Sequence, residues 1–185
     1  MQREYVRNFI NECCIHRATQ KSFRLLKKGA VLGSDDPRDY FTWLFNLRPA
    51  LYDPKIMSII NQHFYETFPK LRKYQLAGME HASTAMITSF VLGVDYELPA
   101  FSIRKQKKTY GTQSWFEGYY DPTRPTIILD DIASLQQNTL MHGYSVLKDT
   151  KFKHEPEFYC IVNIAPKNTN VKSMFVRDDF NLEIN

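Results

Sequence analysis

The fold is decided by residues 126–139, which read TIILDDIASLQQNT. In this stretch three consecutive apolar residues run directly into two adjacent acids, Asp130 and Asp131. A short apolar run without alternation is typical of a strand that is buried on both faces, as in a parallel sheet. Acids at the end of such a strand lie at the carboxyl edge, where open α/β sheets bind ligands. The sequence therefore predicts a ligand site at this edge.

The two acids have two interpretations. Their carboxylates can accept hydrogen bonds from sugar hydroxyls or hold Mg²⁺ through water. In the other interpretation, Asp131 caps the next helix and Asp130 is solvated. The acid pair alone leaves both open.

Polar residues follow the acids at the start of a helix expected over about residues 138–148. These are Ser134, Gln137, Asn138 and Thr139. Hydrogen-bonding groups at a helix N-terminus suit a phosphate. Ordinary helix capping by Ser134 or Asn138 is an equally good explanation.

Strands and helices alternate from about residue 50 onward, which favours an α/β fold with a mainly parallel sheet. We expect one domain over residues 1–185, with an N-terminal region over about 1–50 and a core sheet over about 51–165. The expected helices cover residues 4–15, 53–68, 79–92 and 138–148. The expected strands cover residues 23–26, 40–47, 74–77, 99–103, 127–129, 158–164 and an edge at 174–176. Residues 106–124 are expected to form a long polar loop.

Composition limits the class of protein. The chain has 185 residues, 43% of them hydrophobic, which suits one domain with a sizeable core. Three unclustered cysteines indicate a reducing compartment, and the five histidines lack zinc-ligand spacing. No apolar run is long enough to span a membrane, and the start does not resemble a signal peptide. We therefore expect a cytoplasmic protein.

A dense basic stretch follows the strand expected at 99–103. Residues 104–108 read RKQKK, and four cations in five residues suit a polyphosphate ligand. The long loop that follows suggests a mobile lid. A solvated basic loop is the simpler alternative, and the net charge of +4 makes a nucleic-acid partner unlikely.

Together these stretches resemble type I phosphoribosyltransferases, and among them orotate phosphoribosyltransferase. Four segments carry the resemblance: FRLLKKG at 23–29, FNLR and YDP within 40–54, RKQKKTYG and FEG within 98–118, and the acid-pair stretch at 126–139. The basic loop is the most specific, because the family's mobile catalytic loop reads Arg-Lys-x-x-Lys-x-His-Gly. The resemblance implies a mainly parallel α/β sheet with a small N-terminal hood, and it covers about residues 3–165.

The resemblance also implies an activity and ligands. The activity would be transfer of a phosphoribosyl group from phosphoribosyl pyrophosphate to a nucleobase, orotate-like or other, with Mg²⁺. Asp130 and Asp131 would hold the ribose hydroxyls, and residues 134–139 would lie against the 5′-phosphate. A homodimer is implied as well, in which the loop at 104–118 crosses to the other subunit.

The basic residues would also have roles by this resemblance. Arg104 and Lys105 would contact the pyrophosphate. Lys108 would be the catalytic loop lysine that reaches the neighbouring subunit's site. Lys27 would lie near the base and the pyrophosphate.

Several positions depart from the family pattern. Gln136 stands where the phosphate loop has Gly, and Tyr110 stands where the catalytic loop has His. Near Ala165 the family's base-binding Asp-Arg pair is missing. These departures keep a second hypothesis open: a catalytically impaired phosphoribosyltransferase-like protein that binds nucleotides or serves in regulation or assembly.

Overall fold

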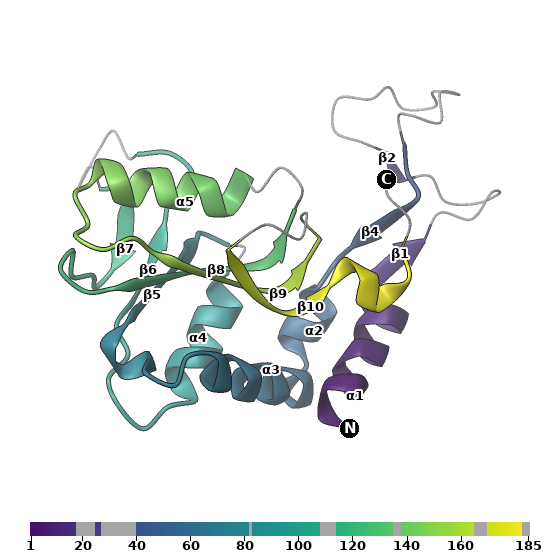
Figure 1. The fold of residues 1–185 in the computed structure, drawn as a ribbon. Coiled ribbons are helices and arrows are strands. Elements are labelled where there is room, and N and C mark those ends of the chain that lie inside the picture. The colour runs from purple at the N-terminus through teal and green to yellow at the C-terminus, as the bar shows by residue number, and fades with distance from the viewer. Residues whose placement is uncertain are drawn as a thin grey trace.

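The structure is a computed structural model that describes residues 1–17, 25–26, 40–81, 83–107, 114–134, 138–164 and 170–182. Its centre is a six-stranded sheet in the order β10-β9-β8-β5-β6-β7 (Figure 1). All neighbouring strands are parallel except β6 and β7, which are antiparallel. This confirms the mainly parallel α/β sheet. The strands are β5 (Gln75–Met79), β6 (Ala100–Ile103), β7 (Phe116–Gly118), β8 (Thr126–Ala133), β9 (Glu157–Asn163) and β10 (Val171–Val176).

Strand β8 is buried on both faces, as its apolar run predicted. Ile127 and Leu129 pack into one hydrophobic cluster, while Ile128 packs into a second. Each of these three side chains is at most 1% exposed. Because successive side chains of a strand point to opposite faces, an unalternating run forces apolar layers on both sides.

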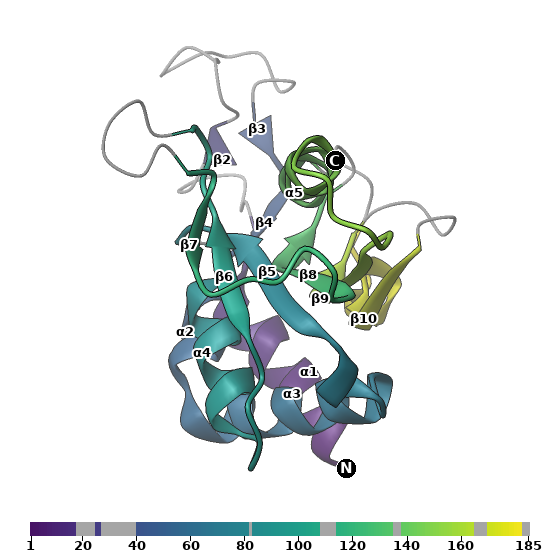
Figure 2. The same cartoon turned by 90° about the vertical axis from the view of Figure 1, so that its left-hand side faces the viewer.

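Helices supply those two layers (Figures 1 and 2). Helices α1, α2, α3 and α4 lie against one face, and α5 lies against the other. A Cβ added at Gly143 of α5 would lie 3.4 Å from side-chain atoms of Ile103 and Ile128, so this helix packs closely on the sheet. The helices are α1 (Gln2–Phe9), α2 (Arg48–Tyr52), α3 (Pro54–Thr67), α4 (Thr84–Leu92) and α5 (Asn138–Asp149).

Helix α3 begins as its sequence predicted. The Asp53 carboxylate accepts hydrogen bonds of 2.9 Å from the backbone N–H groups of Lys55 and Ile56, which have no partner inside the helix. Pro54 occupies the first helical position, where its missing N–H has no cost.

The N-terminal region forms small antiparallel sheets apart from the main one. Strand β1 (Ile15–Arg17) pairs with β4 (Trp43–Phe45), and β2 (Leu25–Leu26) pairs with β3 (Tyr40–Phe41). The expected helix over 4–15 is wrong at its end. The α-helix stops at Phe9, a π-helix follows over Ile10–Cys14, and β1 begins at Ile15. The expected strand over 40–47 is interrupted by a bend at Thr42.

Three further expectations need correction. The helix expected from residue 79 starts at Thr84, because Met79 still belongs to β5. The expected loop over 106–124 contains β7, which pairs with β6. Strand β8 runs on through the acid pair to Ala133, so the acids lie inside the strand.

Strand β10 is confirmed as the sheet edge. Within the described residues, no helix is both long and apolar enough to cross a membrane.

The core between the sheet and α3 is rich in aromatic rings around Tyr159 of β9. Phe64 and Phe90 stack with ring centroids 4.0 Å apart, and Phe64 meets Tyr159 edge to face at 5.0 Å. The Tyr159 hydroxyl oxygen is 3.0 Å from Nδ1 of His63, so this buried polar atom has a partner. The helix layer is thereby fixed to the strand next to β8.

Candidate active site at the carboxyl edge of the sheet

The strand order reverses between β5 and β8. From β5 the chain passes through α4 to β6 on one side, and it later returns to β8 on the other side. Open α/β sheets bind ligands at the carboxyl ends of the strands that flank such a switch point. The pairing of β5 with β8 ends at Gly78 and Leu129, whereas β8 continues to pair with β9 as far as Ala133. Asp130 and Asp131 therefore lie at the predicted edge.

The acid pair is tightly held. Asp130 is only 4% exposed, and its Oδ1 accepts a 3.0 Å hydrogen bond from the backbone N–H of Asp131. The side chain of Thr139, in the first turn of α5, also hydrogen-bonds to Asp130. The interpretation in which Asp130 is solvated is therefore wrong. Asp131 belongs to β8 and α5 begins only at Asn138, so Asp131 is not the residue that caps this helix.

Burial dominates the electrostatics of the pair. Burial, and then the negative charge of Asp131, raise the pKa of the Asp130 carboxyl to about 8. Burial also raises the pKa of Asp131, while the positive charge of Arg48 opposes this shift. Because two carboxylates so close together cannot easily both ionise, the pair retains a proton near neutral pH. In this state it can both donate and accept hydrogen bonds, and once fully ionised it accepts them from the hydroxyls of a diol.

The predicted phosphate-binding residues lie next in the chain. Ser134 is exposed directly after β8, Asn138 starts α5, and Thr139 is brought to the acid pair. Gln137 and Gln136 lie outside the described residues. The N-terminus of α5 thus follows the acids as the sequence predicted.

The basic stretch begins where β6 ends. Arg104 is only 13% exposed in its side chain, and it forms ion pairs with Glu80 (3.9 Å) and Glu117. Lys105 is exposed, and its backbone N–H donates to Glu80. Strands β8 and β6 flank β5, so the acid pair and Arg104 lie on one edge roughly 10 Å apart, twice the spacing of neighbouring strands. Lys108 and Lys27 fall outside the described residues.

Four residues near this edge had no predicted role. Glu80 and Glu117 contact Arg104, and Nε2 of His142 lies 3.4 Å from the Arg104 carbonyl oxygen. Arg48 supplies positive charge near Asp131. The only sequence signal for two of them was their place in resembling segments: Arg48 in FNLR and Glu117 in FEG.

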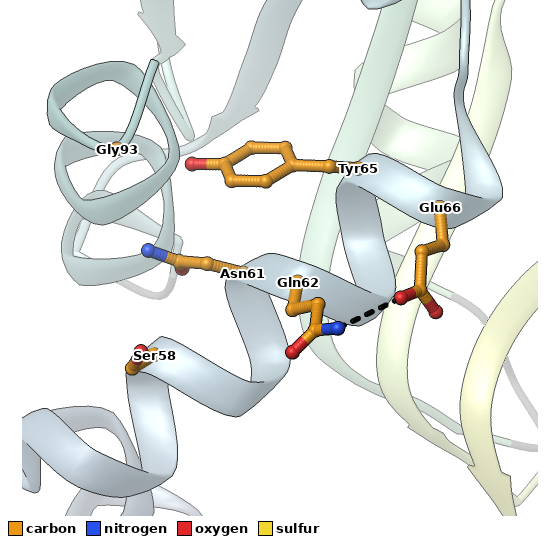
Figure 3. A pocket seen from close by; sticks show the side chains of 6 residues that line it. All are labelled: Ser58, Asn61, Gln62, Tyr65, Glu66 and Gly93. Atoms are coloured by element: carbon orange, nitrogen blue, oxygen red, sulfur yellow. Dashed lines mark hydrogen bonds between the residues drawn. The ribbon is translucent and has the colours of Figure 1, made fainter.

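Two hollows elsewhere are poorer candidates. One, of about 500 Å³, lies between α3 and the end of α4 (Figure 3). Its Asn61 and Tyr65 side chains already hydrogen-bond to backbone oxygens of Ser89 and Phe90 in α4, so it is a seam between helices. The other, of about 760 Å³, is lined by the amino ends of β9 and β10, at the opposite edge from the acid pair.

Comparisons with known proteins agree with this arrangement. The chain is 30% identical over 91 residues to orotate phosphoribosyltransferase of Natronomonas pharaonis, covering 44% of this chain and 53% of that protein. It is 27% identical over 92 residues to the Methanosarcina mazei orotate phosphoribosyltransferase, covering 50% and 48%. The match thus spans about half the length of these curated relatives. No protein-family model matches the sequence.

Solved structures match over nearly the whole chain. A Mycobacterium tuberculosis orotate phosphoribosyltransferase structure has a TM-score of 0.74 at 15% identity, covering 98% of this chain and all of that one. The same enzyme in complex with phosphoribosyl pyrophosphate has a TM-score of 0.66 at 13% identity, covering 97% and 91%.

The fold is that of the type I phosphoribosyltransferases.

The resemblance of this phosphoribosyltransferase-like chain to orotate phosphoribosyltransferase is thereby confirmed. Its acidic residues also fit a particular kind of Mg²⁺ site. Within the described ranges, no three His, Cys, Asp or Glu side chains converge into a metal site. Mg²⁺ commonly keeps several waters and is held by one or two carboxylates plus substrate phosphates. The acid pair fits an Mg²⁺ held largely by substrate and water.

Proposed function

We propose that the chain binds phosphoribosyl pyrophosphate at the carboxyl edge of its sheet and transfers the phosphoribosyl group to a nucleobase. The carrying observation is the acid pair of β8, with Asp130 buried and Asp131 partly buried, at the switch point of a type I phosphoribosyltransferase fold. A buried carboxyl pair has a high cost in stability, so its position at a ligand-binding edge favours a functional role.

The spacing along the edge fits the parts of this ligand. Asp130 and Asp131 would hold the ribose hydroxyls. Ser134, Gln137, Asn138 and Thr139 would surround the 5′-phosphate at the start of α5. The distance of roughly 10 Å to Arg104 and Lys105 leaves room for a pyrophosphate on the other side of the ribose.

The proposed reaction is a substitution at the anomeric carbon of the ribose. A nucleobase nitrogen forms the new bond to this carbon, the bond to the pyrophosphate oxygen breaks, and the base gives up a proton. Positive charge develops on the ribose ring, so water must be excluded while the leaving oxygens are stabilised. Bound Mg²⁺ would neutralise pyrophosphate charge.

The basic residues complete the proposal. Lys108 would stabilise the leaving oxygens from the 104–118 loop of the other subunit in a homodimer. Lys27 would lie near the base and pyrophosphate. Both assignments rest on the sequence resemblance, and the acceptor would be an orotate-like base or another nucleobase.

A second candidate is ligand binding without transfer. The pairing of Arg104 with Glu80 and Glu117 favours it, because a neutralised arginine is a weak stabiliser of a leaving pyrophosphate. A protein of this kind would sense a phosphorylated sugar or nucleotide, or act in regulation or assembly.

Calorimetric titration with phosphoribosyl pyrophosphate and Mg²⁺ tests the proposal. We expect binding by the unaltered chain and loss of binding in the double variant Asp130→Asn/Asp131→Asn. Asp121→Asn removes a carboxylate from an exposed turn and serves as the matched control, which should bind normally. No binding by the unaltered chain would refute the proposed function. Binding without pyrophosphate release across a panel of bases would favour the second candidate.

A further inference from the structure

Arg104 is a tightly constrained charged residue at this edge. Strands β5, β6 and β7 are neighbours in the sheet (Figure 2). Arg104 follows β6, Glu80 follows β5 and Glu117 lies in β7, and both carboxylates pair with the Arg104 guanidinium. The backbone N–H of Arg104 also donates to the Trp115 carbonyl at 2.9 Å. With its side chain 13% exposed, Arg104 is fixed at both backbone and side chain.

The guanidinium nevertheless has an unused donor. Nη1 faces Glu80 and Nη2 faces Glu117, but Nε is buried and has no hydrogen-bond partner among the described residues. A buried donor without an acceptor has a free-energy cost, so such an atom calls for an acceptor that the folded chain does not supply.

The position of this donor indicates what the acceptor is. Nε and Nη2 form one edge of the guanidinium, and this edge can hold a carboxylate or phosphate through two parallel hydrogen bonds. Glu117 contacts only the Nη2 half of the edge. The Glu117 side chain is 54% exposed, whereas that of Glu80 is 25% exposed. An incoming anion therefore meets the more exposed Glu117 first, while the more buried Glu80 stays beside the arginine.

We infer that Glu117 is a built-in competitor for the anion-binding edge of Arg104, and that an incoming pyrophosphate group displaces it. Pyrophosphate would then satisfy both Nε and Nη2, while Glu80 keeps the guanidinium in place. This inference rests on the proposed function, because it takes pyrophosphate as the anion that Arg104 binds. Weakly charged anions would not displace the carboxylate, so Glu117 acts as a specificity-determining residue.

Titration of the full chain with inorganic pyrophosphate, with and without Mg²⁺, tests the inference. Glu117→Gln keeps the size of the side chain and removes its charge, so we expect pyrophosphate affinity to rise about fivefold to tenfold. Glu117→Asp keeps the charge but shortens the reach, and we expect a smaller rise. Glu155→Gln makes the same change of net charge at an exposed position and should leave the affinity unchanged. Thermal melts establish that each variant is folded.

The outcomes separate the two proposals. Binding by the unaltered chain with an unchanged or weaker affinity in Glu117→Gln would overturn the role of Glu117 and leave the proposed function standing. An equal rise in Glu155→Gln would also overturn it, since the effect would then be general electrostatics. Failure of all variants to bind pyrophosphate, together with no binding of phosphoribosyl pyrophosphate, would overturn both.

Discussion

The backbone nitrogen of Asp131 lies 3.0 Å from Oδ1 of Asp130, so the first carboxyl of the pair is fixed by the main chain of the second. This contact holds the two acids close together in β8, where the burial of Asp130 and the partial burial of Asp131 weaken solvent screening of their repulsion. This arrangement lowers the stability of the free protein, as the proposed ligand site would explain.

Asp130→Asn should stabilise the protein at alkaline pH. The folded-state pKa is raised from 3.8 to about 8, so ionisation of Asp130 destabilises the fold progressively as pH rises between these values. The variant has no carboxyl to ionise and so does not lose stability in this way. At alkaline pH we expect its free energy of unfolding to exceed that of the unaltered chain by a few kcal/mol, the order of magnitude that the pKa shift implies. Thermal and urea unfolding at pH 4 and pH 9 measure the difference. A variant equally destabilised at both pH values would contradict the burial argument.

Ligand binding should release a proton near neutral pH. If ribose hydroxyls or an Mg²⁺-bound ligand favour the ionised pair, binding at pH 7 expels the proton held by Asp130, whose pKa is about 8. Calorimetry with phosphoribosyl pyrophosphate and Mg²⁺ in buffers of different ionisation enthalpy counts the released protons. We expect a count approaching one at pH 7 and a clearly lower count at pH 9, where the carboxyl is already ionised. The same count at both pH values would argue against this coupling.

His63 should make the fold acid-sensitive. Burial, and then the positive charge of Arg3, lower the pKa of His63 from 6.5. His63 therefore binds a proton more readily in the unfolded chain than in the folded chain. The free energy of unfolding falls as pH drops below about 6.5. His63→Gln should remove the part of this loss that comes from His63, while an amide still hydrogen-bonds to Tyr159.

Urea unfolding at pH 5 and pH 8 measures this dependence. The exposed His154, changed to Gln, is the matched control and should keep the pH dependence of the unaltered chain. If both variants retain it equally, another group is responsible.

Gly78→Ala should destabilise the close packing of β5 against Ser83, the residue before α4. A Cβ at Gly78 would lie 1.9 Å from Oγ and 2.5 Å from Cβ of Ser83, so one of the two elements must move. We expect a loss of about 1–3 kcal/mol in the free energy of unfolding. In a Ser83→Gly background the same substitution should cost less, and a double-mutant cycle measures this coupling. Equal costs in both backgrounds would place the strain elsewhere.

Much of the fold could be predicted from the sequence because the main sheet relies on local pattern. The apolar run of β8 and its two acids are contiguous in the chain. Two rules therefore sufficed to place the acids at the carboxyl edge: an unalternating apolar run forms a buried parallel strand, and open α/β sheets bind ligands at the carboxyl ends of their strands. Asp53 and Pro54 likewise predicted the start of α3 from neighbouring residues alone.

The partners of Arg104 could not be predicted because they depend on register. Strand β7 has three residues and no apolar alternation, and its pairing sets Glu117 opposite Ser102, next to Arg104. Glu80 reaches the same point from the turn that follows β5, in a separate part of the chain. The sequence therefore indicated a free anion-binding arginine, whereas the fold surrounds it with carboxylates.

The hydrogen bond between the Arg104 nitrogen and the Trp115 oxygen has an evolutionary consequence. It closes the segment between them at its base, with both ends anchored on the paired strands β6 and β7. Because closure entropy grows only slowly with length, insertions or exchanged sequences in this segment would cost little stability. The chain between these two anchors could thus change in length without disturbing the sheet that carries the acids.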